Sequence, residues 1–231
     1  MKFSWAYLNF HPNRNMKKFN NLLRRIWQKL KYEQKTEWDK IAYSFLKNCG
    51  QILDIGCGEG RFIKQGPKKI IGIDRNIKSV EKCKQQDYNV IQSDVRSLPF
   101  SSQSINGIHC SHVIEHFSPG DVHKILSDFD RVLTPGGILA IRSPLLWNGF
   151  YSDLTHIRPY NPEAVIHYLT ASNQRTLEQI SVNYEIVFLK WRYKRLDLKN
   201  KYLNAILNIL NRWGFPWLQK NGYMLIMKKH E

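Results

Sequence analysis

The sequence has little cysteine and no long apolar run near its start, two features that mark many secreted and membrane-spanning proteins. Its 231 residues include four cysteines, which form neither a C-x-x-C pair nor the even framework of a small disulfide-stabilised domain. Asn9, His11, Asn13 and Arg14 interrupt the apolar residues near the N-terminus. We therefore expect reduced thiols, no signal peptide, no membrane span and a cytoplasmic location.

Acidic residues are also scarce relative to basic ones. The chain has 35 Lys and Arg against 19 Asp and Glu, a formal net charge of +16 at pH 7. This balance favours anionic partners, namely nucleic acid, anionic lipid or a phosphate-bearing small molecule, and does not choose among them. Lysines spread evenly over the surface would give the same total, so the charge informs about partners only where it clusters.

A glycine-rich loop follows a short apolar run and is the most informative part of the chain. Residues 52–55 predict a strand, and Gly56, Gly58 and Gly60 follow it at alternate positions. Glycine lets the backbone turn sharply and lets a ligand lie against the main chain. The helix start that follows offers free N–H groups. The loop therefore predicts a nucleotide-type ligand.

Two carboxylates narrow the ligand further. Asp54 lies in the first strand, and Asp74 ends a second strand, about twenty residues later, where a carboxylate can accept both hydroxyls of a ribose. The loop lacks the G-x-G-x-x-G spacing of dinucleotide sites and the lysine of a phosphate-binding loop. Asp54 would repel a phosphate but suit a cationic amino group. These residues predict an adenosine-like ligand.

Together with residues 91–95 and 133–139, this pattern resembles the class I S-adenosylmethionine (SAM)-dependent methyltransferases, in particular the small-molecule group called type 11, over about residues 50–145. The resemblance implies SAM as cofactor and a Rossmann-like, doubly wound α/β fold with a mostly parallel seven-stranded sheet whose last strand is antiparallel. The chain departs from the family at Ile105-Asn106, where a Phe-Asp pair is usual. The acid usual at this position is therefore replaced by an amide.

The family's cofactor contacts map onto the ends of the first four strands. The resemblance implies that Asp54, Gly56 and Gly58 hold the methionine part of SAM, that Asp74 binds the ribose, and that Asp94 with the Val95 backbone faces the adenine amino group. Residues 108–117 would close over the sulfonium. The full predicted cofactor set is Asp54, Gly56, Gly58, Asp74, Arg75, Asp94, Val95 and Ser111.

The remaining segments predict added elements around one methyltransferase domain at residues 49–231. Residues 1–48 are expected to form N-terminal amphipathic helices, one at 16–31 and a second from Thr36 to Leu46. An aromatic loop at 143–163 is the expected substrate loop, followed by a helix to about Ala171. Residues 184–189 and 223–227 predict the last two strands, with a basic, helical insertion at about 190–220 between them.

Both basic amphipathic helices allow two interpretations. Lys and Arg on one side with Trp, Phe and Leu on the other is typical of a helix that lies in the headgroup region of a membrane. An ordinary helix that covers the sheet with its apolar stripe has the same pattern. The sequence leaves open a peripheral contact with the anionic inner face of the membrane.

Methyl transfer from SAM to a hydroxyl needs an aligned acceptor and a group that removes a proton. His156 in the aromatic loop and His116 after the fourth strand are the candidate bases, with Asp153 and Glu115 as orienting acids. Alternatively, Glu115 and His116 only hold the loop over SAM. The candidate acceptor contacts are Tyr151, Arg158 and Tyr160, because aromatic faces suit sugar rings and arginine binds anionic groups.

His112, Glu115 and His116 form an H-x-x-E-H pattern. It faintly resembles the E-x-x-E-H pattern of the small-RNA 3′-terminal ribose methyltransferases, which use a divalent metal. With the distant His156 it invites a metal interpretation, but the first glutamate of that pattern is His112 here, and Val-Ile-Glu-His is also common in metal-free relatives. No metal ligand is therefore assigned from the sequence.

The sequence thus predicts a SAM-dependent methyltransferase that acts on a small-molecule acceptor, favouring a hydroxyl of a sugar or of a lipid-linked or polysaccharide-pathway intermediate. An RNA methyltransferase is an alternative supported by the charge, although no added RNA-binding module is evident. A non-catalytic, membrane-associated protein with the same fold is a second alternative.

Overall fold

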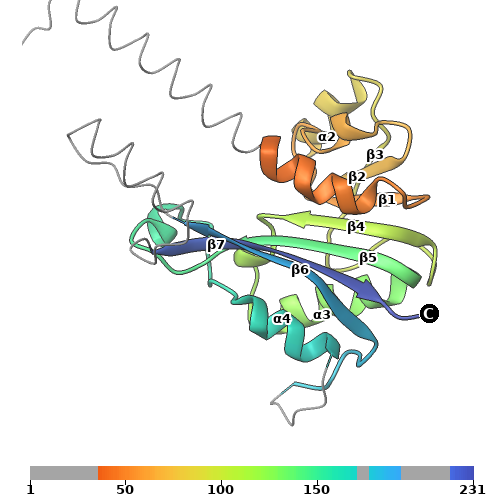
Figure 1. The fold of residues 1–231 in the computed structure, drawn as a ribbon. Helices are drawn as coiled ribbons and strands as arrows, with labels where there is room; N and C mark the ends of the chain where they lie inside the picture. The colour runs from red at the N-terminus through yellow and green to blue at the C-terminus, as the bar shows by residue number, and fades with distance from the viewer. Residues whose placement is uncertain (1–35, 171–176, 194–218) are drawn as a thin grey trace, which may run out of the picture. The chain divides into compact units, whose positions relative to one another are not determined.

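The computed structural model of the chain is shown in Figure 1. It describes residues 36–170, 177–193 and 219–231. The chain divides into two compact units, residues 1–41 and 42–231, and the features below belong to the second unit unless stated. The amphipathic helix predicted at 16–31 and residues 194–218 of the predicted basic insertion lie outside the described residues.

Seven strands form one sheet, in the order β3-β2-β1-β4-β5-β7-β6. Strands β1 to β5 pair in parallel, whereas β7 runs antiparallel to both β5 and β6. The predicted fold class, including the antiparallel last strand, is therefore confirmed. The strands are β1 Ile52–Ile55, β2 Ile70–Asp74, β3 Val90–Gln92, β4 Ile105–Ser111, β5 Leu133–Pro144, β6 Tyr184–Tyr193 and β7 Lys220–Lys229.

Helices lie on both faces of the sheet: α3 and α4 share one face and α2 lies on the other (Figure 1). All four residues of β1 are buried, as expected for a central parallel strand covered on both faces. The helices are α2 Ile77–Lys84, α3 Pro119–Val132 and α4 Pro162–Thr170, with 3₁₀ turns η1 Ile63–Gln65, η2 Ile114–His116 and η3 Phe150–Ser152. Residues 36–46 are also helical, as predicted.

The local sequence explains where these elements begin. Ser118 caps α3, since its side chain accepts a hydrogen bond from the Asp121 N–H, and Pro119 occupies the first turn, where its missing N–H costs nothing. Helix α4 likewise begins at Pro162, as the sequence predicted. Among the described residues, no helix is both long and apolar enough to cross a membrane.

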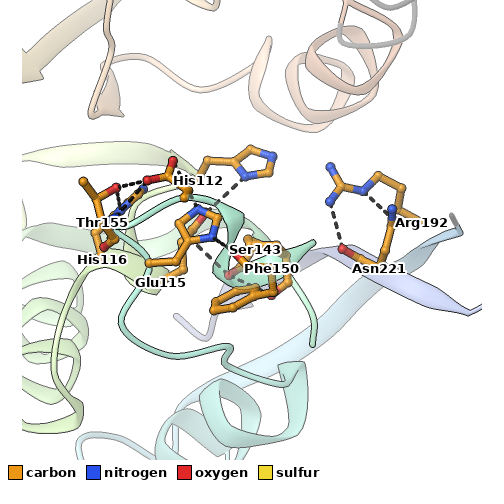
Figure 2. Close-up of polar contacts among 11 residues, drawn as sticks. His112, Glu115, His116, Ser143, Phe150, Thr155, Arg192 and Asn221 are labelled. Atoms are coloured by element: carbon orange, nitrogen blue, oxygen red, sulfur yellow. Dashed lines mark hydrogen bonds and ion pairs between the residues drawn. The ribbon is translucent and has the colours of Figure 1, made fainter. Parts of the chain in front are cut away.

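The last two strands are longer than the sequence predicted. Strand β6 continues past Leu189 to Tyr193, so Arg192, which the sequence analysis assigned to the insertion, belongs to the sheet. Its guanidinium is held by Asn221 of β7, donating from Nε to the side-chain oxygen at 2.9 Å and from Nη2 to the main-chain oxygen at 2.8 Å (Figure 2). Residues 189–193 alternate apolar and basic side chains, which fits a strand, but the sequence prediction counted these basic residues as part of the insertion.

Candidate active site

A cavity of about 240 Å³ opens at the carboxyl ends of the parallel strands. Parallel strands end at the same edge of a sheet, and the connections that leave β1 to β4 there are where doubly wound folds bind ligands. Six of the residues predicted from sequence line it: Gly56, Asp74, Arg75, Asp94, Val95 and His116. His112, Val113 and Phe117, from the segment predicted to close over the sulfonium, line it as well, and so does Thr155, to which the sequence assigned no contact.

The glycine loop forms one wall of the cavity. Gly56, Gly58 and Gly60 all have positive φ, at 63°, 54° and 77°, a region that side-chain-bearing residues rarely adopt. A Cβ on Gly56 would come within 2.7 Å of the Val113 side chain. Any larger residue at position 56 would therefore displace a second wall residue, so the loop has to be glycine for the cavity to keep its shape.

Asp74 is held in place by main-chain donors. Its Oδ2 accepts a hydrogen bond from the Gly58 N–H at 2.9 Å, and its Oδ1 accepts one from the Asn76 N–H at 2.8 Å. Asn76 in turn caps α2. Each carboxylate oxygen can accept a second hydrogen bond, so the side chain is oriented by the loop and still has capacity for two ligand hydroxyls.

Asp94 presents a second carboxylate to the cavity. Arg96 donates to it from the main chain at 2.9 Å and from its guanidinium at 3.0 and 2.6 Å. These hydrogen bonds hold the pKa of Asp94 below its usual value. The group therefore stays ionised near neutral pH and can only accept hydrogen bonds, which suits an exocyclic amino group.

Three predicted cofactor residues do not line the cavity. Asp54 is buried, with its Oδ1 2.7 Å from Nδ1 of His109, and Phe62 stacks on the His109 ring at 3.7 Å. Gly58 acts on the cavity through its amide contact with Asp74. Ser111 is near the end of β4, and its hydroxyl is buried with no hydrogen-bond partner among the described residues. The predicted contacts of Asp54 and Gly58 with the methionine part, and of Ser111 with the cofactor, stay predictions.

The pairing of Asp54 with His109 was missed by the sequence analysis. In the parallel register of β1 and β4, Asp54 stands opposite His109. The pattern of apolar and polar residues along either strand does not predict which residues of the two strands lie opposite each other. Asp54 and His109 are 55 positions apart in the sequence. The pair gives the buried Asp54 carboxylate a hydrogen-bond partner, as buried charges require.

The other end of the cavity is formed by two loops that meet after β4 and β5. The main-chain N–H groups of Ile157 and Arg158 donate to the Glu115 carbonyl at 2.9 and 3.3 Å. This brings the rings of His116 and His156 to 4.9 Å between centroids. Figure 2 shows His112, Glu115 and His116 together with Thr155 and Ser143. Both candidate bases are thus brought together, with Glu115 beside them.

Hydrogen bonds fix the tautomers of both histidines. Nδ1 of His156 lies 2.7 Å from the Phe150 carbonyl, which can only accept, so Nδ1 carries a proton. Nδ1 of His116 lies 3.0 Å from both the carbonyl and the hydroxyl of Thr155. That hydroxyl donates to Asp153 at 2.7 Å, so His116 must be the donor to Thr155. Each neutral imidazole therefore has its lone pair on Nε2.

The predicted acceptor residues are placed differently from one another. Tyr151 is 60% exposed, and Arg158 lies over the Tyr160 ring at 6.0 Å. Tyr160 is buried, and its hydroxyl donates to the Phe117 carbonyl at 2.9 Å. Tyr160 therefore lies in the core behind the cavity wall rather than on it, whereas Tyr151 and Arg158 are accessible at the edge of the site.

Known proteins match this part of the chain. Residues 53–141 match the family model described as a methyltransferase domain. The chain is 30% identical over 98 residues to an uncharacterized methyltransferase of Synechocystis sp., covering 39% of this chain and 45% of that protein. It is 29% identical over 136 residues to a carboxy-S-adenosyl-L-methionine synthase of Vibrio vulnificus, covering 50% and 55%. The chain spans about half the length of these curated relatives.

The same architecture occurs in a SAM-dependent methyltransferase from Archaeoglobus fulgidus, which superimposes with a TM-score of 0.62 at 22% identity over 85% of this chain and 94% of that one. The fold is therefore that of the class I SAM-dependent methyltransferases, and residues 53–141 are similar to a methyltransferase domain. The matched segment lies within the part of the sequence that resembles the type 11 group, and this similarity supports SAM as the cofactor.

Asn106 replaces the acid usual in this family, and the structure gives it a local role. It lies at the start of β4, at the opposite end of that strand from the cavity. Its side-chain oxygen accepts from the Gln51 N–H at 2.9 Å, and its amide donates to the Thr134 hydroxyl at 3.3 Å. The residue therefore joins the chain segments that enter β1 and β5.

We expect Asn106→Ala to lower the free energy of unfolding by about 1–2 kcal/mol, because the half-buried Gln51 amide loses its acceptor. SAM affinity should not change, since the cavity is at the other end of the strand. Urea denaturation and calorimetric titration with SAM measure the two quantities. Weaker SAM binding at unchanged stability would contradict this assignment.

Proposed function

We propose that the protein transfers the methyl group of SAM to a hydroxyl of a small acceptor that has an apolar part, such as a lipid-linked or polysaccharide-pathway sugar. The observation that carries the proposal is a single cavity with two acids at one end and histidines at the other, since Asp74, Asp94 and His116 all line it. Such a cavity can place an adenosine beside a proton acceptor.

The residues at the first end fit SAM. Asp74 and Asp94 offer acceptors for ribose hydroxyls and an adenine amino group, and the Gly56 backbone has no Cβ between it and the ligand. Two carboxylates without a facing lysine disfavour a phosphate tail, so the site suits SAM better than a dinucleotide. When bound, SAM supplies an electrophilic methyl group on a positively charged sulfur.

The second end suits removal of a proton from the acceptor. Nε2 of His116 and of His156 can take the proton of a hydroxyl, because Nδ1 of each ring is fixed as a donor. The acceptor oxygen then bonds to the methyl carbon while the carbon–sulfur bond breaks and its electron pair stays on sulfur. The cavity walls align the two atoms, which is the larger part of catalysis for an in-line displacement.

Exposed apolar side chains beside this end support an acceptor with an apolar part. Leu154 is 99% exposed, Ile157 55% and Leu146 59%, and all three lie between β5 and α4, in the segment that carries Thr155 and His156. Such side chains on one loop, next to an active-site cavity, favour contact with a lipid chain or a membrane surface. The excess of basic residues supports the anionic inner face of the membrane as that surface.

The first test is binding of the cofactor, measured by thermal denaturation. SAM and S-adenosylhomocysteine at about a hundred times their Kd should add about 2.7 kcal/mol of stability. For a chain of this size, that raises Tm by about 5 to 10 °C. NAD and ATP at the same concentration are the controls and should have little effect. Equal shifts with all four ligands, or none, would contradict SAM binding.

Transfer itself is tested with SAM carrying a tritiated methyl group. The protein is incubated with membrane extract, soluble sugars or total RNA, and each mixture is partitioned between organic solvent and water. We expect label in the organic phase with the membrane extract. Label in RNA alone would replace the proposed acceptor with nucleic acid, and no label in any fraction would favour the non-catalytic alternative.

A further inference from the structure

We propose that Glu115, His116 and His156 bind a divalent transition-metal ion at the acceptor end of the cavity. Each of the three residues offers one donor atom, and these atoms all lie within 4.8 Å of one another. They come from η2 and from the loop after β5, so the site exists only in the folded chain. The sequence analysis assigned no metal ligand, and the geometry is what points to one.

The donor atoms are close enough to converge on one ion. Tetrahedral zinc sites place nitrogen and oxygen donors at about 2.0–2.2 Å from the metal, so that donors are about 3.3–3.5 Å apart. The three donor atoms now lie at most 4.8 Å apart, so each pair would have to approach by about 1.5 Å or less to bind one ion. Small rotations of the two imidazole rings and the glutamate side chain can supply this change without moving the backbone.

The hydrogen bonds around both histidines are those of metal ligands. His116 donates Nδ1–H to Thr155, and His156 donates Nδ1–H to the Phe150 carbonyl. Histidines that bind metals usually donate their other ring nitrogen to a carbonyl or a carboxylate, which fixes the tautomer and the ring orientation. Nε2 of His156 lies 3.9 Å from the nearer Asp153 oxygen, too far for a hydrogen bond that would compete.

Glu115 is fully buried, so its carboxylate needs polar partners. Its Oε1 is 3.1 Å from Nδ1 of His112, and its Oε2 accepts from the Ser143 hydroxyl at 3.3 Å. Each carboxylate oxygen has one partner and can accept a second contact, so Glu115 can serve as the third ligand.

Two imidazoles and one carboxylate determine the class of metal. Imidazole suits zinc, cobalt, iron and nickel, whereas magnesium and calcium prefer oxygen ligands. Three protein ligands leave at least one coordination position open. Because His116 also lines the cavity, an ion bound there would lie close to the place where an acceptor would bind.

The role of the ion rests on the proposed function, whereas its binding does not. A bound metal ion would take the acceptor oxygen as a ligand and lower the pKa of its hydroxyl, so that the proton leaves to water near neutral pH. In the metal-bound protein His116 and His156 would then act as ligands and take no proton. This deepens the proposed transfer to a hydroxyl by naming what activates the oxygen.

The test is titration of the untagged, chelator-treated chain with Co²⁺, followed by visible absorbance, with Zn²⁺ added afterwards as a competitor. We expect about one equivalent of Co²⁺ per chain, with absorption bands that Zn²⁺ removes. Glu115→Gln and His156→Gln should each lower the affinity for Co²⁺ by at least about 100-fold. Even the loss of a residue that only hydrogen-bonds to a metal ligand lowers metal affinity by about 10- to 100-fold. His123→Gln is the matched control, because His123 bonds to the Glu178 carbonyl outside the cluster.

Several outcomes would overturn the metal site: no bound Co²⁺, binding that His156→Gln leaves unchanged, or equal loss in His123→Gln. His156 is partly exposed, so its variant keeps the test valid if Glu115→Gln fails to fold. The proposed metal site and the proposed methyl transfer can be refuted independently of each other. Label transferred by a chain that binds no Co²⁺ would refute the metal alone, and Co²⁺ binding without transfer to any acceptor would refute the proposed function alone.

Discussion

Asp74→Ala is expected to weaken SAM binding by at least about 100-fold. Asp74 ends β2, lines the cavity and has both oxygens oriented by main-chain donors. Hydrogen bonds to a charged acceptor are worth about 1.5–3 kcal/mol each, and loss of two ribose contacts therefore costs about 3 kcal/mol or more. Isothermal titration with SAM and with S-adenosylhomocysteine measures the change.

Two controls separate lost contacts from a disturbed loop. Asp74→Asn keeps one acceptor oxygen and should give an intermediate loss, whereas Glu81→Ala removes an exposed acid from α2 and should change nothing. Because Gly58 also loses its acceptor in Asp74→Ala, the ligand-free melting temperature is recorded for each variant. Unchanged affinity in a folded Asp74→Ala protein would refute the placement of the ribose.

His156→Ala is expected to lower kcat by about 10²- to 10⁴-fold with little change in SAM affinity. The ring lies against Phe150 and against His116, which lines the cavity, whereas His156 has no contact with Asp74 or Asp94 among the interactions of the described residues. It either takes the proton itself or, with the ion bound, holds the metal that activates the hydroxyl. Both roles concern the acceptor, so the cofactor should bind as before.

Single-turnover assays with a verified acceptor measure the loss. Metal content of the purified variant distinguishes the two roles: a metal ligand loses the ion, whereas a base keeps it and loses the limb of the pH profile that the imidazole contributes. The control is His123→Gln, which should retain full turnover. Full turnover in His156→Ala would exclude both roles and leave His116 as the candidate base.

The residues at the cofactor end of the site were predictable because the sequence features that identify them lie close together in the chain. The glycine loop and Asp74 follow directly from strand ends, and the positions of strand ends follow from apolar runs bounded by turn residues. In a doubly wound sheet, such ends meet at one edge whatever the details of packing. Gly56, Asp74 and Asp94 are accordingly found on the cavity wall where the sequence placed them.

The acceptor end was only partly predictable. His116 and His156 stood out as candidates by residue type, but their contact depends on how the loop after β5 folds back on η2. Two residues were placed differently by the sequence and by the structure. From the sequence, Tyr160 was expected to contact the acceptor from a loop, and Arg192 was expected in the insertion after a strand. The structure places Tyr160 in the core and Arg192 in β6.

The sequence by itself determined the fold class, the cofactor loop and the acids that face the cavity, because each follows from local propensity and from spacing within one βα unit. Only the tertiary structure decided that Asp54 pairs with His109, 55 residues away, and that His116 bonds to Thr155, 39 residues away. Contacts between segments depend on strand register and loop packing, which are set when the whole core forms. The proposed metal site likewise depends on contacts between segments and was decided only by the tertiary structure.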